Sequence, residues 1–219
     1  MVENVWIISK WRTMKKTLIF GNNDCGQLAK FYLQNDSSHE FAAFCIDDEF
    51  QTNKETFNWS LVKKKFSPSD YNFFIPLYDN KLRKEKTQEV KKYGYDLISY
   101  VSSKAIVFSS IGENCFIMEN NTIQPFVSVG NNIIMWSGNH IGHHSKINDN
   151  VFFSSHVVLS GHCNVESYSW FGVNSTIRNN IKIAEGTFVA MSSSIVSDTE
   201  PYKKYMGNPA RAYGDVDRF

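Results

Sequence analysis

An apolar residue recurs at every sixth position from Ile111 to Ile195 without interruption. In a chain with 42% apolar residues, one chosen register of this length would be filled by chance about twice in a million trials. A helix needs a period near 3.6 and an ordinary strand a period of 2, so neither fits. The strict period predicts a parallel β-helix of triangular cross-section, with three hexads in each 18-residue turn and about five turns. The register consists of Ile111, Ile117, Ile123, Val129, Met135, Ile141, Ile147, Phe153, Leu159, Val165, Phe171, Ile177, Ile183, Val189 and Ile195.

A second register, four residues after the first, supports this prediction. Its members are mostly small or β-branched, as expected for side chains that fit beside the apolar ones at the corners of a prism. Asn121 and Asn139 are its polar members.

The first half of the chain has a different rhythm, in which short apolar runs alternate with amphipathic stretches. This alternation predicts a small parallel sheet with helices packed on it, a Rossmann-like domain. The predicted strands are Thr17–Phe20, Phe41–Ile46, Asn72–Leu77 and Asp96–Val101, and the predicted helices are Cys25–Gln34 and a lysine-rich, solvent-facing Asn80–Tyr93. We therefore divide the chain into an N-terminal extension (1–14), this domain (15–105), the β-helix (106–200) and a C-terminal loop or tail (201–219).

Composition excludes several classes of protein. With 23 basic and 22 acidic residues, the chain lacks the broad positive surface that binds nucleic acid or anionic membranes. Its apolar runs are far shorter than the roughly 18 residues that span a bilayer. The four cysteines are widely separated, which is typical of reduced thiols in a cytoplasmic protein.

Five of the six histidines fall between positions 140 and 162. Residues 18 apart in such a coil lie directly above each other, about 4.8 Å apart, so His143 lies one turn below Gly161. Glycine leaves its backbone N–H open to approach. A histidine that accepts a proton and an N–H that meets a developing oxyanion are the groups that acyl transfer requires.

Two other interpretations of the histidines stay open. They could be polar residues stacked along one face, above all His140 and His162, or they could bind zinc. Gamma-class carbonic anhydrases, which share the prism fold, use an H-x4-H pair, whereas the close pairs here are H-x2-H and H-H. We therefore predict no metal site.

The segments GNHIGHHSKI, LSGH, FGVNSTIR and YMGNPAR, set in this hexad array, resemble the PglD/NeuD-type hexapeptide-repeat sugar-nucleotide acetyltransferases. The resemblance extends from Lys15 to Arg211 and implies a left-handed β-helix. It implies that His143 is the catalytic base and that the N–H of Gly161 donates to the thioester carbonyl. Relatives often place a glutamate after the base to orient its ring; here that position is His144, and Asn139 and Asp149 are further candidates for the orienting role.

The resemblance also implies binding sites for two substrates. The acetyl-coenzyme A groove between subunits would be lined by His156, Gly161, Gly172, Ala190, Met206, Gly207, Asn208, Pro209 and Arg211, and it implies a homotrimer. The nucleotide of the donor sugar would be bound by Gly21, Asn22, Asn23, Asp47 and Asp48. Asp24 departs from the family pattern, because a glycine is common there. A charged turn is the alternative interpretation of Asp47 and Asp48.

We therefore expect a cytoplasmic enzyme that transfers acetyl from acetyl-coenzyme A to the amino group of a UDP- or dTDP-linked amino-deoxysugar, in the synthesis of surface polysaccharide such as O-antigen or of a protein-linked glycan. Neither metal, nucleic acid nor membrane insertion is expected. Two alternatives remain: an O-acetyltransferase of sialic-acid type, and a non-catalytic trimer that binds nucleotide sugars.

Overall fold

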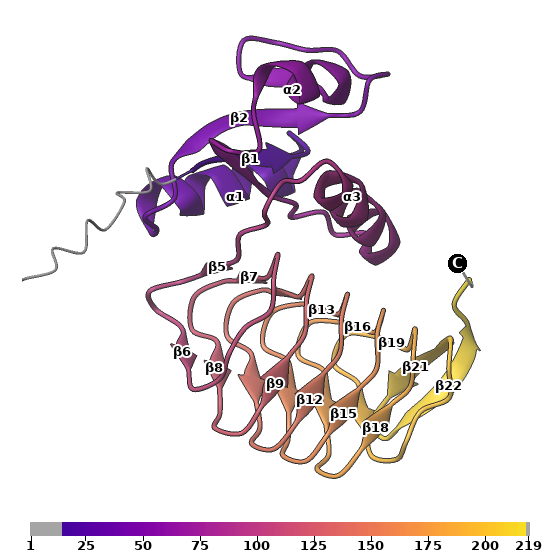
Figure 1. Ribbon diagram of the computed structural model, residues 1–219. Helices are drawn as coiled ribbons and strands as arrows, with labels where there is room; N and C mark the ends of the chain where they lie inside the picture. Colours follow the sequence, from indigo (N-terminus) through magenta and orange to yellow (C-terminus); the bar gives the residue numbers. More distant parts are fainter. Residues whose placement is uncertain (1–14, 218–219) are drawn as a thin grey trace, which may run out of the picture.

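The computed structural model describes residues 15–217, which form an α/β unit seated on a β-solenoid (Figure 1). The predicted extension, residues 1–14, lies outside the described residues. Within residues 15–217, no helix is long and apolar enough to cross a membrane.

The N-terminal unit contains a four-stranded parallel sheet, which confirms the predicted parallel sheet; the strand order is β3 (Thr56–Asn58), β2 (Phe41–Ile46), β1 (Lys16–Phe20) and β4 (Tyr71–Phe74). Its fourth strand is β3 rather than the predicted Asp96–Val101. In that segment Leu97 makes a single bridge to Phe73, and Tyr100 and Val101 pair with the solenoid instead. The helices of this unit are α1 (Asp24–Asn35), α2 (Trp59–Lys65) and α3 (Asn80–Lys92).

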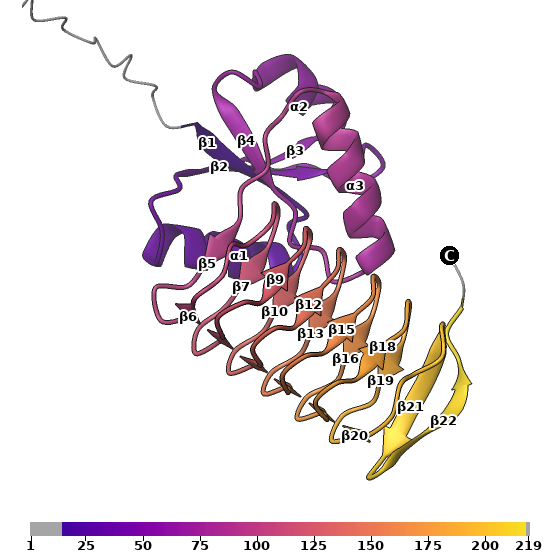
Figure 2. The same cartoon turned by 60° about the horizontal axis from the view of Figure 1, so that its bottom comes forward.

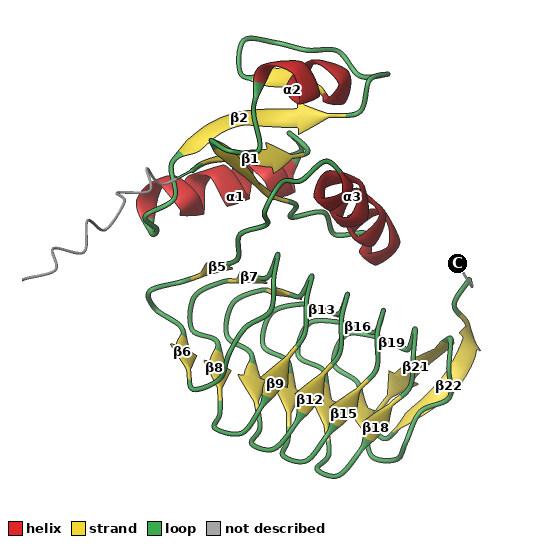
Figure 3. Cartoon of the chain, viewed as in Figure 1, coloured by secondary structure: helices red, strands yellow, loops and turns green. Residues whose placement is uncertain are grey.

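The solenoid is built from two-residue strands separated by tight turns, stacked into three parallel sheets (Figures 2 and 3). The first sheet contains β5 (Tyr100–Val101), β7 (Phe116–Ile117), β10 (Ile134–Met135), β13 (Phe152–Phe153), β16 (Trp170–Phe171) and β19 (Phe188–Val189). The second contains β6 (Ile106–Val107), β8 (Thr122–Ile123), β11 (His140–Ile141), β14 (Val158–Leu159), β17 (Thr176–Ile177) and β20 (Ser194–Ile195). The third contains β9 (Ser128–Val129), β12 (Lys146–Ile147), β15 (Asn164–Val165) and β18 (Lys182–Ile183).

The six-residue period builds the core as predicted. Every register residue from Ile117 to Ile195 is buried, and Ile111 packs partly buried against the same core. At most corners one residue in six adopts a left-handed backbone, with φ between 54° and 66° for the non-glycine residues. Asparagine and histidine tolerate this conformation better than most side chains, which is one reason they recur at these turns.

The solenoid has about six turns, one more than the repeat predicted. The additional first turn contains β5 and β6. Tyr100 pairs with Phe116 and Ile106 with Thr122, a separation of 16 residues, whereas the turns from β7 to β19 repeat every 18. The shorter turn falls outside the hexad register and so gave no periodic signal.

The C-terminal segment differs from the predicted loop. It forms an antiparallel hairpin of β21 (Lys203–Gly207) and β22 (Ala210–Asp215), with β21 paired to β19. Tyr205 and Ala210 are buried in the solenoid core. The hairpin thus covers the open edge of the first sheet.

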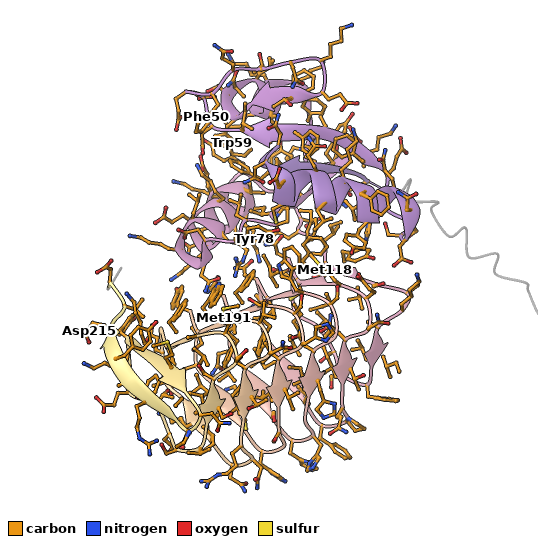
Figure 4. The ribbon with its side chains drawn as sticks, turned by 180° about the vertical axis from the view of Figure 1, so that it is seen from behind. Phe50, Trp59, Tyr78, Met118, Met191 and Asp215 are labelled. Carbon is orange, nitrogen blue, oxygen red and sulfur yellow. The ribbon has the colours of Figure 1, made fainter. Side chains whose placement is uncertain are left out.

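Buried polar contacts join the two units. The fully buried guanidinium of Arg83 donates to the carbonyl oxygens of Asn132 (3.1 Å) and Tyr78 (3.2 Å) and also to that of Leu77. Figure 4 shows Tyr78 at this boundary, where its ring lies 5.8 Å from that of Trp136. Helix α3 is therefore not wholly solvent-facing, because one face of it packs on the solenoid.

Candidate functional site

Three exposed histidines meet at one corner of the solenoid. We call this the histidine corner; it comprises the turns 124–127, 142–145 and 160–163, which connect the second sheet to the third. His144 and His162 occupy its left-handed positions, with φ of 57° and 60°. The ring of His143 is perpendicular to both, with centroids 5.2 and 5.1 Å away.

The ring of His143 lies directly against Gly161, as the 18-residue arithmetic predicts. A Cβ on Gly161 would lie 2.8 Å from Cε1 and 2.9 Å from Nε2 of His143, so a side chain at 161 would displace the ring. A Cβ on Gly142 would lie 2.5 Å from the backbone nitrogen of Gly161. Within residues 15–217 this N–H donates no hydrogen bond. Two glycines thus leave room for a ring and an unsatisfied donor side by side.

His144 is the orienting candidate that the structure brings to His143, since the Nδ1 atoms of the two rings are 3.0 Å apart. One of these nitrogens must carry the shared hydrogen. If Nδ1 of His143 is the donor, its Nε2 is left with a lone pair, which is the form a base needs. The backbone N–H of His143 donates to Oε1 of Gln124 at 2.9 Å and fixes the turn.

Asn139 and Asp149, the other orienting candidates, do not reach His143. Asn139 is buried, and its amide accepts from the N–H of Val157 (2.8 Å) and donates to the carbonyl of Trp136. The carboxylate of Asp149 lies at another corner, where it accepts from the N–H of Asn131 at 2.8 Å.

Several residues predicted to bind acetyl-coenzyme A lie along a different edge. We call this edge the methionine corner; it comprises the turns 136–139, 154–157, 172–175 and 190–193, which connect the first sheet to the second, together with residues 206–207. The ring of His156 lies against Gly138, and a Cβ on Gly172 would lie 2.5 Å from the nitrogen of Met191.

The far end of this edge is apolar and accessible. Met191 is 68% exposed and Met206 55% exposed, beside Ala190. The N–H of Gly207 donates to Oγ of Ser193 at 3.2 Å, which holds the hairpin there. Asn208, Pro209 and Arg211 are exposed at and just after the hairpin turn. Gly161 is the predicted groove residue that lies at the histidine corner instead.

The N-terminal unit carries a cavity of about 420 Å³ at the carboxyl ends of β1 and β2. Four of the five residues predicted to bind nucleotide line it: Gly21, Asn22, Asn23 and Asp47. Asn23 also caps α1, accepting from the N–H of Gly26 at 3.1 Å. The other residues that line the cavity, which the sequence analysis does not single out, are Phe20, Ile46, Phe50, Gln51, Leu77 and Leu82.

The two carboxylates at the end of β2 have different surroundings. Asp47 forms an ion pair with Lys86 of α3. Asp48 is not among the residues lining the cavity. It accepts from the N–H of Ser60 at 2.9 Å and from the hydroxyl of the same residue, and these hydrogen bonds lower the pKa of Asp48. Its contacts match the alternative interpretation of a charged turn.

Sequence reasoning also missed residues around His143. Phe126 is 75% exposed, and its ring lies 4.7 Å from that of His144. Gln124 and Phe126 stand 18 positions before Gly142 and His144. Applying the 18-residue register backwards from the histidines would have located both.

Comparison with known proteins identifies the fold. No family model matches the chain. Among solved structures, the acetyltransferase domain of PglB from Neisseria gonorrhoeae, in complex with acetyl coenzyme A, is 19% identical, with a TM-score of 0.82 over 91% of this chain and 99% of that one. PerB from Caulobacter crescentus, in complex with CoA and GDP-perosamine, is 19% identical, with a TM-score of 0.84 over 92% of this chain and 98% of that one. WeeI from Acinetobacter baumannii is 19% identical, with a TM-score of 0.77 over 91% of this chain and all of that one.

A local match exists to one curated sequence, a probable macrolide acetyltransferase from Lysinibacillus sphaericus. It is 43% identical over 42 residues, which cover 19% of this chain and 23% of the relative. The chain thus has the left-handed β-helix fold of acetyltransferases. The solved structures that share its architecture almost end to end include sugar-nucleotide N-acetyltransferases, as the sequence resemblance implied.

Proposed function

We propose that this protein is an acetyltransferase that moves acetyl from acetyl-coenzyme A to the amino group of a nucleotide-linked amino sugar. The observation that carries the proposal is the placement of the His143 ring beside the free N–H of Gly161, on a fold shared with enzymes that bind these two classes of substrate. A solved histidine-to-asparagine variant of perosamine N-acetyltransferase, in complex with CoA and GDP-perosamine, adds support for a functional histidine on this fold.

The chemistry follows from the two groups. Nε2 of His143 takes a proton from the sugar amine as the amine nitrogen attacks the carbonyl carbon of the thioester. The N–H of Gly161 donates to the oxygen on which negative charge develops. Collapse of the tetrahedral intermediate breaks the C–S bond and releases coenzyme A, whose sulfur receives the proton. His144 accepts from Nδ1 of His143 throughout, which keeps the proton-accepting nitrogen directed at the substrate.

The acetyl donor would bind along the methionine corner of a neighbouring copy of the chain. The base and this corner lie at opposite borders of the second sheet, so one chain holds two half-sites. The outward residues of that sheet include no lysine, arginine, aspartate or glutamate: they are Ile106, Thr122, His140, Val158, Thr176 and Ser194. The third sheet instead presents Lys146 and Lys182. The uncharged face is the better surface for a homotrimer.

We interpret the N-terminal unit as a Rossmann-like domain. The nucleotide would occupy the cavity that this unit carries. Backbone N–H groups at the start of α1 suit phosphate, and Phe50, 59% exposed, offers a ring to a base. We retain UDP or dTDP as the expected nucleotide. The prediction of a cytoplasmic protein continues to rest on the four separated cysteines.

Incubation of the protein with acetyl-coenzyme A and a panel of UDP-, dTDP- and GDP-linked amino sugars tests the proposal. Thiol release and mass spectrometry should reveal a product heavier by one acetyl group and stable to mild base. An alkali-labile product would identify a hydroxyl acceptor. Absence of turnover across the panel, with no protection of the fold by acetyl-coenzyme A in thermal unfolding, would contradict an acetyltransferase.

A further inference from the structure

The histidine corner contains more imidazole than the proposed reaction uses. His143, His144 and His162 each offer a ring nitrogen, and the three nitrogens lie within 4.8 Å of one another. All three side chains are exposed. The reaction assigns roles to His143 and His144 and none to His162.

A stack of polar side chains would not require this convergence. In the next turn of the same corner, the position equivalent to His144 and His162 is Asn180, with a φ of 59°. The rings of His144 and His162 are stacked, with centroids 4.9 Å apart and planes 14° from parallel. His143 approaches both from the side at 90° and 89°. The corner therefore brings three ring nitrogens within 4.8 Å of one another at the surface.

We propose that these three histidines form a binding site for a divalent transition-metal ion of the zinc class. Zinc–imidazole bonds of about 2.0–2.1 Å place tetrahedral ligand nitrogens about 3.3 Å apart. Binding would require the stacked rings of His144 and His162 to turn toward a common ion, which exposed side chains can do by rotation about their side-chain bonds. Three neutral imidazoles and an open fourth position suit zinc, cobalt, nickel or copper rather than magnesium or calcium.

The bound ion would oppose the proposed acetyl transfer. A ring nitrogen of His143 that holds a metal either loses its lone pair to the ion or breaks its contact with His144, so the base is lost. The metal is thus a reversible inhibitor, and the expectation of a metal-free reaction is unchanged. This consequence rests on the proposed function, whereas the binding site itself does not.

Titration of chelator-treated protein with Co²⁺, followed by its visible absorption bands, and with Zn²⁺, followed by calorimetry, tests the site. We expect one ion per chain, with Zn²⁺ bound more tightly than Co²⁺ and no response to Mg²⁺. His162→Asn places the residue found at 180 into the same backbone conformation. Loss of a residue that only supports a metal ligand typically costs about 10–100-fold in affinity. His162→Asn removes a ligand itself and should weaken Zn²⁺ binding by more than that.

His156→Asn is the matched control for binding. His156 is also an exposed histidine in a left-handed turn, φ 60°, and the next turn of its corner carries Asn174. It should leave Zn²⁺ affinity unchanged. Equal affinity in wild type and His162→Asn, or no binding by wild type, would overturn the site. Binding without any acetyl transfer would leave the site standing and contradict the proposed function. In active protein, zinc should inhibit wild type more strongly than His162→Asn.

Discussion

The imidazole of His143 packs against the α-carbon of Gly161, one turn along the solenoid, closely enough that a single methyl group at 161 would lie 2.8 Å from Cε1 of the ring. Gly161→Ala therefore keeps the backbone and moves the ring of His143, the proposed base. Because a misplacement of about 1 Å costs on the order of 10² in rate, kcat should fall by about that factor.

The ring is exposed and can move, so the free energy of unfolding should change by no more than about 0.5 kcal/mol. Asn179→Ala, at the same turn position 18 residues later, is the control and should retain activity. Full activity in Gly161→Ala would show that this contact does not position the base.

Replacement of His143 by alanine removes the proposed base. Loss of a positioned general base typically costs about 10²–10⁴ in rate, and we expect kcat to fall by that factor. Circular dichroism and thermal unfolding should remain those of wild type, since the side chain is exposed. A rate within a few-fold of wild type would refute the assignment of His143.

The Asp36 carboxylate should make the free energy of unfolding depend on pH in the acid range. Its carboxylate accepts from the N–H of Ser103 (3.0 Å) and the hydroxyls of Tyr100 (2.7 Å) and Ser102 (2.8 Å). These bonds hold the pKa of Asp36 well below its ordinary value. A lowered folded-state pKa gives stability that is complete above the unfolded pKa, near 3.9, and is lost as the pH falls below it.

Asp36→Asn should therefore flatten the decline in stability between about pH 4 and pH 2, as measured by urea unfolding at each pH. Asp24→Asn is the comparison, because the described structure gives the Asp24 carboxylate no hydrogen bond. An unchanged slope in Asp36→Asn would mean that Asp36 does not link the two units in solution.

Arg83→Met tests the joint between the units. The fully buried guanidinium serves several backbone carbonyls and the side-chain oxygen of Asn80 at 2.7 Å, and burial lowers the pKa of Arg83 to about 10. Each buried acceptor left unpaired costs about 1–3 kcal/mol, so unfolding should become easier by more than about 2 kcal/mol. Lys92→Met, exposed at the end of the same helix, should cost less than about 0.5 kcal/mol. Equal effects would contradict this role.

The parts predicted best from sequence are those in which one residue type repeats at one spacing. The six-residue register identified the solenoid and placed His143 beneath Gly161, because every turn from β7 to β19 has the same length. The 16-residue first turn has no such repeat. The segment Asp96–Val101 instead predicts a strand of the N-terminal unit, since Tyr100 and Val101 suit either sheet.

The burial of α3 was not predictable from residue type. Its spacing predicted the helix closely, but Arg83 and Thr87 are polar and gave no sign of a buried face. They are buried because Thr87 donates to Oδ1 of Asn132 at 3.1 Å and Arg83 donates to the carbonyl of the same asparagine. That pairing joins residues more than 40 positions apart, and only the fold brings them together.

The uniform turns also fix distances along the solenoid axis, because each turn adds the same rise. The N-terminal unit lies along one side of the solenoid (Figure 1), where the amide of Asn80 donates to the carbonyl of Tyr168 at 3.4 Å. His143 lies in the turn that follows β11. Each additional turn would move His143 along the axis by about 4.8 Å relative to the nucleotide cavity, without altering any local contact within a turn. In the proposed reaction, the number of turns ahead of His143 therefore sets how far the acetylated atom lies from the nucleotide, and an insertion of 18 residues there would select longer acceptors.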